Sequence, residues 1–230
     1  FYDYYFKKNL IRTNPPRQVD VPKIKNKNII RLDPNEIAQL LDEAESGEKL
    51  SGRQLASHEK TKVRDVAILT LLLGTGIRVS ECVGLNLEDV DFNNGAIRII
   101  RKGGNEALIY FGDEVSQALE AYMNGSRKTA EPAAGHEEAL FISLNKTRIT
   151  TRSVERLVKK YSRLVTTVKK ITPHKLRSTF GTALYQETGD IYLVADTLGH
   201  KDVNTTKKHY AAIDEHRRRM AANVVKLRES

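Results

Sequence analysis

The residues best suited to do chemistry in this sequence lie in its C-terminal third. His174 and Arg177 occur in Thr-Pro-His-Lys-Leu-Arg, His200 follows Leu-Gly, and Tyr210 ends Lys-Lys-His-Tyr. A tyrosine attacks phosphorus as its phenoxide, and its ordinary pKa of about 10 means that it needs cations or a base nearby. Arginine suits a phosphate because its planar fork binds two oxygens and stays charged. These residue types predict attack on a phosphodiester by a tyrosine.

Two basic residues further upstream complete this set. Arg78 lies in Gly-Thr-Gly-Ile-Arg-Val-Ser-Glu, and Lys102 lies at the tip of a predicted hairpin. Metal-free phosphoryl transfer needs cations around the equatorial oxygens and a proton donor for the leaving alkoxide. Taken singly, each residue has an ordinary explanation: Arg78 pairs with Glu81 at a helix start, Lys102 is solvated, and lone histidines pack or cap. Their joint occurrence is what indicates a site.

The charge of the chain favours a polyanionic partner. Its 230 residues include 38 Lys and Arg against 29 Asp and Glu, a net charge of +9. Between residues 146 and 178 there are eleven basic residues and one acid, Glu155. Such a basic strip points to nucleic acid.

Cysteine content and hydropathy indicate the compartment. The single cysteine, Cys82, lies among apolar residues and is predicted to be a core thiol. No apolar run reaches the about 18 residues of a membrane-spanning helix, and no signal peptide is visible. We therefore expect a cytoplasmic protein without a membrane partner.

The elements that must position these residues are mainly helical. The spacing of apolar and turn-forming residues predicts a mainly α (α+β) fold with one small three-stranded antiparallel sheet. Residues 48–60 are polar and are expected to form a loop. Helices are predicted at 33–47, 63–73, 114–123, 151–166, 174–186, 191–198, 203–212 and 215–227, and strands at 87–92, 96–101 and 107–111.

The motifs, in this order, resemble the tyrosine recombinase (phage integrase) family over about residues 30–215. They are Gly76-Ile77-Arg78-Val79-Ser80-Glu81, the hairpin lysine, His174-Lys175-Leu176-Arg177, Leu198-Gly199-His200, and Thr205-Thr206 before Tyr210. The resemblance implies a catalytic domain that cuts and rejoins double-stranded DNA through a 3′-phosphotyrosyl link. It also implies a homo-tetramer on synapsed DNA, a monomer off DNA, accessory DNA-bending or directionality factors, and no metal or other cofactor.

The same resemblance assigns roles to individual residues. Arg78 and Arg177 would clamp the scissile phosphate, Lys102 would be the general acid, His174 would assist proton transfer, His200 would bind a phosphate oxygen, Tyr210 would be the nucleophile, and Glu81 would brace the site. The step from His200 to Tyr210 is ten residues. Xer-type members commonly have nine, which would put His209 at the nucleophile position, but histidine is a poor substitute for tyrosine there.

The resemblance also divides the chain. Residues 1–27 are interpreted as the end of a missing N-terminal core-binding domain plus an interdomain linker, and residues 28–230 as the catalytic domain. The C-terminal helix packs either in cis or on a neighbouring protomer.

A predicted basic helix supplies the candidate DNA contacts. Its basic residues recur at helical spacing and form one face: Arg152, Arg156, Lys159, Lys160 and Arg163. Most are expected to follow phosphates, while Arg148, Thr150 and Arg152 at the helix start are candidates to reach base edges. The alternative is that all of them contact phosphates. Lys175 is a further candidate contact.

Two other functions stay open at this point. One is a type IB topoisomerase-like enzyme, which uses the same nicking chemistry to relax supercoils without pairing two sites. The other is a catalytically silent DNA-binding relative, in which the tyrosine does not reach the phosphate.

Overall fold

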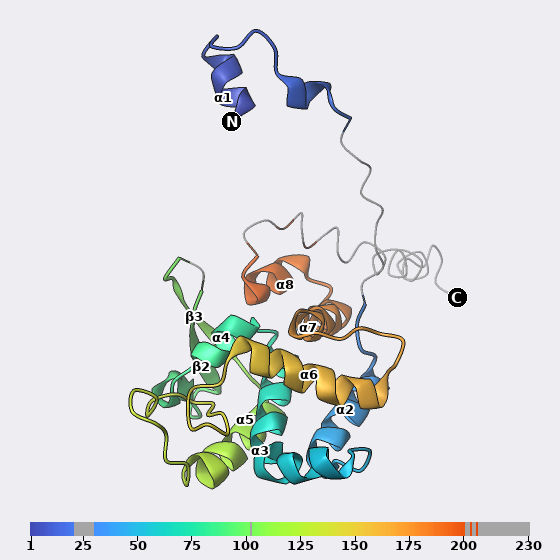
Figure 1. The fold of residues 1–230 in the computed structure, drawn as a ribbon, viewed down its shortest axis with the longest axis vertical. Helices are drawn as coiled ribbons and strands as arrows, with labels where there is room; N and C mark the ends of the chain where they lie inside the picture. Colours follow the sequence, from blue (N-terminus) through green and yellow to red (C-terminus); the bar gives the residue numbers. More distant parts are fainter. Residues whose placement is uncertain (21–29, 102, 201–202, 204–205, 207–230) are drawn as a thin grey trace, which may run out of the picture.

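The computed structural model describes residues 1–20, 30–101, 103–200, 203 and 206. Figure 1 shows a helical body with a small sheet at one side. The elements are α1 (Tyr2–Lys7), η1 (Pro15–Gln18), α2 (Pro34–Ser46), α3 (Gly52–Thr75), α4 (Val79–Gly84), η2 (Leu87–Asp89), β1 (Val90–Asp91), β2 (Ala96–Ile100), β3 (Glu106–Tyr110), α5 (Asp113–Tyr122), η3 (Met123–Arg127), α6 (Thr151–Val165), α7 (Pro173–Thr188) and α8 (Ile191–Leu198). The predicted mainly α fold with a small antiparallel sheet is confirmed.

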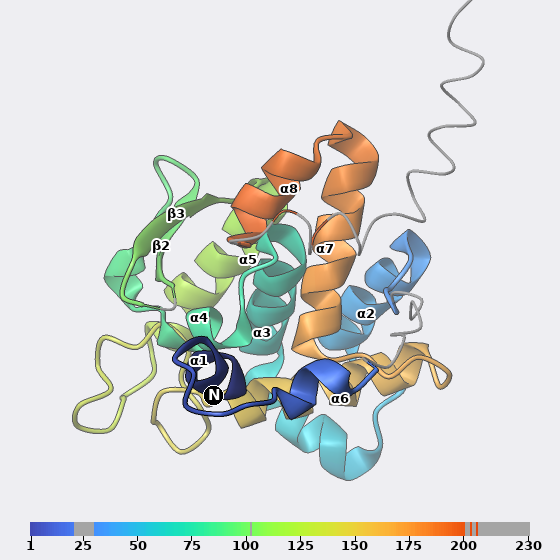
Figure 2. The same cartoon turned by 90° about the horizontal axis from the view of Figure 1, so that it is seen from above.

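Helix α3 is the centre of the molecule. Ile68, Leu69, Leu71 and Leu72 are fully or almost fully buried, and the helix lies between α5 and α7 (Figure 2). It ends at Gly76, whose φ of 63° is left-handed and whose Cα faces Phe180 so closely that a Cβ would lie 2.3 Å from the ring. Glycine therefore stops α3 and allows α7 to approach its end.

The expectation of a loop over residues 48–60 is wrong, because α3 begins at Gly52. The Ser51 backbone N–H donates to Gln54 Oε1 at 3.2 Å, one half of a capping box that starts the helix. The first turns of α3 are polar because they face solvent. His58 and Thr61, in the turns that follow, are buried.

Helix α2 confirms the predicted start at Asp33 and stop at Gly47. Asp33 accepts from the Glu36 N–H at 3.0 Å, and the Asp33 N–H donates to Glu36 Oε2 at 2.8 Å. The hydrogen bond from the Glu36 N–H to the Asp33 carboxylate is the main cause that lowers the pKa of Asp33 below its ordinary value. Gly47, with a φ of 70°, closes the helix.

The sheet has the strand order β1-β2-β3, antiparallel throughout, with Ile97 opposite Ile109. One face of the hairpin is buried through Ile97, Ile99 and Ile109, whereas Leu108 on the other face is 61% exposed. The predicted strand at 87–92 is shorter than expected. The Asn86 N–H donates to Asp89 Oδ2 at 2.8 Å, which folds residues 87–89 into a 3-10 turn before β1.

A buried polar cluster joins α3 to α6. Tyr161 Oη lies 3.0 Å from both Asp65 Oδ2 and His58 Nδ1, and all three residues are buried. Arg64 and Thr61 also donate to the Asp65 carboxylate. The cluster fixes the position of α6 over α3 (Figure 1).

Helices α7 and α8 confirm the predictions at 174–186 and 191–198. Pro173 occupies the first turn of α7, and Gly189 ends it with a φ of 73°. Asp190 caps α8 by accepting from the N–H groups of Tyr192 and Leu193. The helices predicted at 203–212 and 215–227 lie outside the described residues, except for Val203 and Thr206, which are helical. No helix in the described part of the chain is both long and apolar enough to cross a bilayer.

Candidate active site

Four of the predicted catalytic residues line one cavity. Arg78, His174, Arg177 and His200 surround a space of about 320 Å³, together with Ile77, Val79, Ser80 and Pro173. The cavity lies where the starts of α4 and α7 meet the end of α8. Arg78 and three residues that lie about a hundred positions further along the chain therefore present two guanidinium groups and two imidazoles to the same space.

Arg78 enters the cavity from the N-cap position of α4. Its backbone N–H donates to Glu81 Oε2 at 2.7 Å, and its Nη1 donates to Glu81 Oε1 at 2.8 Å. The Glu81 side chain is only 4% exposed, whereas that of Arg78 is 40% exposed. Glu81 thus holds the arginine by main chain and side chain at once and leaves part of the guanidinium open to a ligand.

Arg177 is the buried cation of the cavity. Only 6% of the residue is exposed, and its Nη1 donates to the Gly76 carbonyl at 2.6 Å. Its Nη2 donates to the Leu198 carbonyl. Because Gly76 ends α3 and Leu198 ends α8, this one side chain fixes two helix ends against the site.

The C-terminal end of α8 gathers three arginines. The carbonyls of Asp196 and Thr197 accept hydrogen bonds from Arg101. The Leu198 carbonyl accepts from Arg177, and the Gly199 carbonyl accepts from Arg78. The last carbonyls of a helix have no partner within the helix and carry the negative end of its dipole, so they favour cations. This helix end therefore orients the three guanidinium groups.

The two histidines are placed by short local features. His174 is exposed in the first turn of α7, one turn before Arg177, so the two residues share a helix face. His200 follows Gly199, and its N–H donates to the Ala195 carbonyl at 2.8 Å. Its Nδ1 lies 2.8 Å from Oγ1 of the fully buried Thr206, which sets the plane of the ring.

Lys102 and Tyr210 lie outside the described residues. The residues that flank Lys102 form the tip of the β2–β3 hairpin, where the Arg101 N–H donates to the Asn105 carbonyl at 2.8 Å. In the described part of the chain, no group of three or more His, Cys, Asp or Glu side chains is arranged to hold a metal ion.

Residues 30–217 match the model of the phage integrase family.

The chain belongs to the phage integrase family. The tyrosine recombinase XerC of Thermodesulfovibrio yellowstonii is 35% identical over 209 residues, which cover 90% of this chain and 66% of that protein. The crystal structure of XerA recombinase matches with a TM-score of 0.70 and 25% identity, over 96% of this chain and 73% of that one. The Tn1549 transposon integrase, solved in complex with transposon right end DNA, matches with a TM-score of 0.66 and 26% identity, over 96% and 76%. This chain spans only 62 to 66% of the length of the first XerC relatives.

Helix α6 presents the basic face of this integrase-family chain to solvent. Arg152, Arg156, Lys159 and Arg163 are exposed. The prediction that Lys160 shares this face is wrong. Its side chain turns inward, with Nζ 3.5 Å from Asp65 Oδ2 and 4.0 Å from the centre of the Tyr161 ring. Burial lowers the pKa of Lys160, although Asp65 opposes this effect.

Arg148 and Thr150 have structural contacts that the sequence pattern does not reveal. Arg148 Nη1 donates to the carbonyls of Val83 and Leu85 at 3.1 and 2.7 Å, and its Nη2 donates to Asn86 Oδ1. Thr150 caps α6 by accepting from the Ser153 N–H at 3.2 Å. Arg148 thus anchors the loop after α4, and an isolated loop arginine gives no local signal of such a contact.

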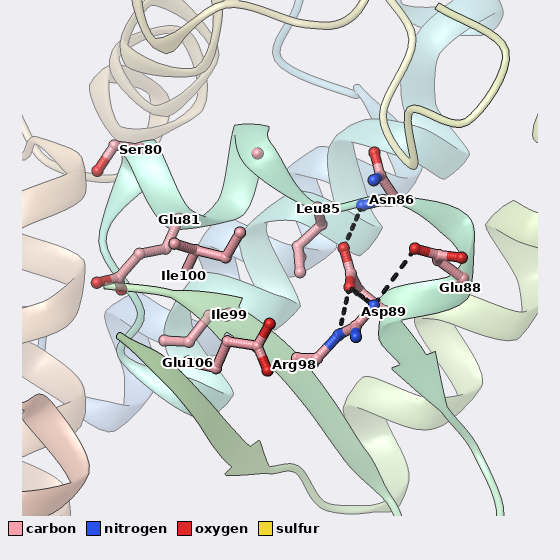
Figure 3. A pocket seen from close by; sticks show the side chains of 11 residues that line it. Ser80, Glu81, Leu85, Asn86, Glu88, Asp89, Arg98, Ile99, Ile100 and Glu106 are labelled. Atoms are coloured by element: carbon pink, nitrogen blue, oxygen red, sulfur yellow. Dashed lines mark hydrogen bonds and ion pairs between the residues drawn. The ribbon is translucent and has the colours of Figure 1, made fainter. Parts of the chain in front are cut away.

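A second cavity, of about 220 Å³, lies between α4 and the sheet and shares Ser80 with the first. Figure 3 shows Arg98 between Asp89 and Glu88, with Glu106 on the next strand. Arg98 Nε donates to Asp89 Oδ1 at 3.0 Å, and this bond is the main cause of the raised pKa of Arg98. The acidic groups Glu81, Glu88, Asp89 and Glu106 line this second cavity, whereas the lining of the first cavity holds two arginines and two histidines and no acidic residue.

Proposed function

We propose that this chain is the catalytic part of a site-specific DNA recombinase or integrase that cleaves and rejoins strands through a 3′-phosphotyrosyl intermediate. The observation that carries the proposal is the cavity lined by Arg78, His174, Arg177 and His200. The family membership supports it, and so do the relatives named as tyrosine recombinases and the transposon integrase solved with DNA.

The chemistry begins with the scissile phosphate in the cavity. Arg78 and Arg177 neutralise its non-bridging oxygens, and His200 donates a hydrogen bond to one of them. Since the end of α8 and Glu81 already hold both guanidinium groups, little reorganisation accompanies the build-up of charge in the transition state.

Tyr210 then attacks phosphorus through its phenolate oxygen. The bond from phosphorus to the 5′ oxygen breaks, Lys102 gives its proton to that oxygen, and His174 assists removal of the phenol proton. In the reverse step a 5′-hydroxyl attacks the phosphorus of the phosphotyrosine and gives its proton to Lys102. The bond from phosphorus to Tyr210 breaks, and His174 assists return of the proton to the leaving phenolate. Because the covalent link conserves the phosphodiester energy, ligation needs no nucleotide cofactor.

Double-stranded DNA is the proposed partner. The exposed cations of α6, namely Arg152, Arg156, Lys159 and Arg163, follow the phosphates beside the cavity, and Lys175 in α7 adds a contact. We propose a homo-tetramer on two synapsed sites, a monomer off DNA, and a cytoplasmic location. Residues 1–27 belong with an N-terminal core-binding domain and its linker, and accessory DNA-bending or directionality factors assist assembly.

A two-site plasmid assay separates this function from its alternatives. The substrate carries two copies of a duplex selected from a random-sequence pool by binding to the purified full-length protein. A recombinase yields resolved or inverted plasmid, whereas a plasmid with one copy yields no rearrangement. Relaxation of both plasmids without rearranged product would favour the topoisomerase-like enzyme. Binding with neither product nor covalent adduct would favour the silent relative.

A further inference from the structure

Arg101 connects two parts of the fold that are almost a hundred residues apart in sequence. It follows β2 directly, and its Nη2 donates to the Thr197 carbonyl at 3.1 Å and to the Asp196 carbonyl at 3.5 Å. Both carbonyls belong to the last turn of α8, just before His200. The side chain therefore ties the β2–β3 hairpin to the helix end that orients Arg78 and Arg177.

The contact is close as well as hydrogen-bonded. A Cβ at position 199 would lie 2.6 Å from Arg101 Cζ, so the guanidinium packs directly on the Gly199 backbone. Arg101 Nε is buried and has no hydrogen-bond partner among the described residues. A guanidinium that is held by main-chain carbonyls and partly desolvated has few alternative positions.

The main chain of Arg101 closes the turn that contains position 102. Its N–H donates to the Asn105 carbonyl at 2.8 Å, and its carbonyl accepts from the Gly104 N–H at 3.0 Å. Little packing supports the neighbouring outer face of the hairpin, since Ile100 is 67% exposed. The Arg101 side chain is thus the described contact that fixes this turn relative to α8.

We propose that Arg101 is a positioning residue that fixes the turn carrying Lys102, its covalent neighbour, relative to the end of α8. The inference rests on the proposed function, in which Lys102 protonates the leaving 5′ oxygen. Arg101 acts through the main chain of the turn and through α8, whose end also holds the two arginines that bind the phosphate. The end of α8 thereby fixes the turn that carries the general acid relative to Arg78 and Arg177, which bind the phosphate.

The test compares two leaving groups in single-turnover cleavage by the full-length protein. In the normal substrate the leaving group is a 5′ oxygen, which needs a proton, whereas a 5′-bridging sulfur leaves as a thiolate without one. We expect Arg101→Gln to slow cleavage of the oxygen substrate by at least about tenfold, a fraction of the 10²- to 10⁴-fold that general acids contribute. Cleavage of the sulfur substrate should stay within about twofold of wild type.

Arg98→Gln is the matched control, because Arg98 lies on β2, just before Arg101, but pairs with Asp89 and Glu88 instead of α8. It should leave both rates near wild type. In a Lys102→Ala background, Arg101→Gln should add less than about twofold, because residues that act as a unit are not additive.

Three results would overturn the inference: equal slowing of both substrates, a full additional loss in the Lys102→Ala background, or a weaker DNA affinity with a smaller salt slope, which would make Arg101 a phosphate contact. The melting temperature of each variant is measured first. If Arg101→Gln does not fold, Arg101→Lys replaces it, since it keeps the charge and loses the planar fork. Failure of the wild-type protein to cleave either substrate would instead refute the proposed function.

Discussion

Replacement of Tyr161 by phenylalanine tests the buried cluster that fixes α6. The variant Tyr161→Phe removes one oxygen that lies 3.0 Å from Asp65 Oδ2 and 3.0 Å from His58 Nδ1. Burial, followed by the charge of Asp65, raises the pKa of Tyr161, so the phenol keeps its proton and donates it to Asp65. The phenol oxygen then accepts from His58, which assigns the proton of that imidazole to Nδ1.

The expected loss follows from the groups left behind. In the variant, Asp65 keeps Arg64, Thr61 and Lys160 as partners. His58 Nδ1 loses its hydrogen bond to the Tyr161 hydroxyl, and His58 Nε2 has no partner among the described residues. Loss of a hydrogen bond to a buried charged group costs about 1.5–3 kcal/mol, so we expect about 2 kcal/mol. For a domain of this size that corresponds to a melting temperature lower by about 4–8 °C.

Thermal and urea unfolding of purified protein measure this loss. Tyr110→Phe is the control, because Tyr110 is 70% exposed and should change the free energy of unfolding by less than about 0.5 kcal/mol. Tyr161→Phe should also change the free energy of DNA binding less than it changes the free energy of unfolding, because Tyr161 faces the core. A Tyr161→Phe protein as stable as Tyr110→Phe would refute the account of how α6 is held.

Three further predictions concern charge and burial. Arg156→Gln should lower the slope of log affinity for DNA against log salt by about 1, whereas Lys160→Gln should leave that slope unchanged and lower stability instead. Burial raises the pKa of the Cys82 thiol to about 12, so iodoacetamide at pH 8 should label the protein only after unfolding; rapid labelling of folded protein would contradict the buried position. The pKa of Asp33 is lowered from 3.8 in the folded state, so its stabilisation is present above that pH and is lost as pH falls through the lowered value. The stability difference between wild type and Asp33→Ala should therefore shrink below about pH 4 in urea titrations.

Local signals in the sequence predicted the helix ends well. Asp33 with Pro34, and the left-handed glycine at 47, act within a few residues, so their meaning can be read from the chain alone. The start of α3 is harder to predict, because the residues after Ser51 are polar and resemble a loop, although the Ser-x-x-Gln spacing is typical of a helix start.

The site was predictable in its residue types but not in its support. The motifs named Arg78, His174, Arg177 and His200, which the fold brings to one cavity. No local sequence pattern indicates that carbonyls at the end of α8 accept hydrogen bonds from three arginines, because each of these bonds joins distant segments of the chain. The inward orientation of the Lys160 side chain cannot be predicted for the same reason, because the helical spacing of Lys160 fits the exposed face.

The central claim is that Tyr210 forms a covalent bond with DNA at the phosphate held by this cavity. The most direct measurement is a denaturing gel of wild type, Tyr210→Phe and His209→Phe, each incubated with a nicked suicide substrate built on the selected duplex. We predict a covalent protein–DNA band for wild type and His209→Phe and none for Tyr210→Phe. A band that persists in Tyr210→Phe, or that disappears only in His209→Phe, would contradict the account.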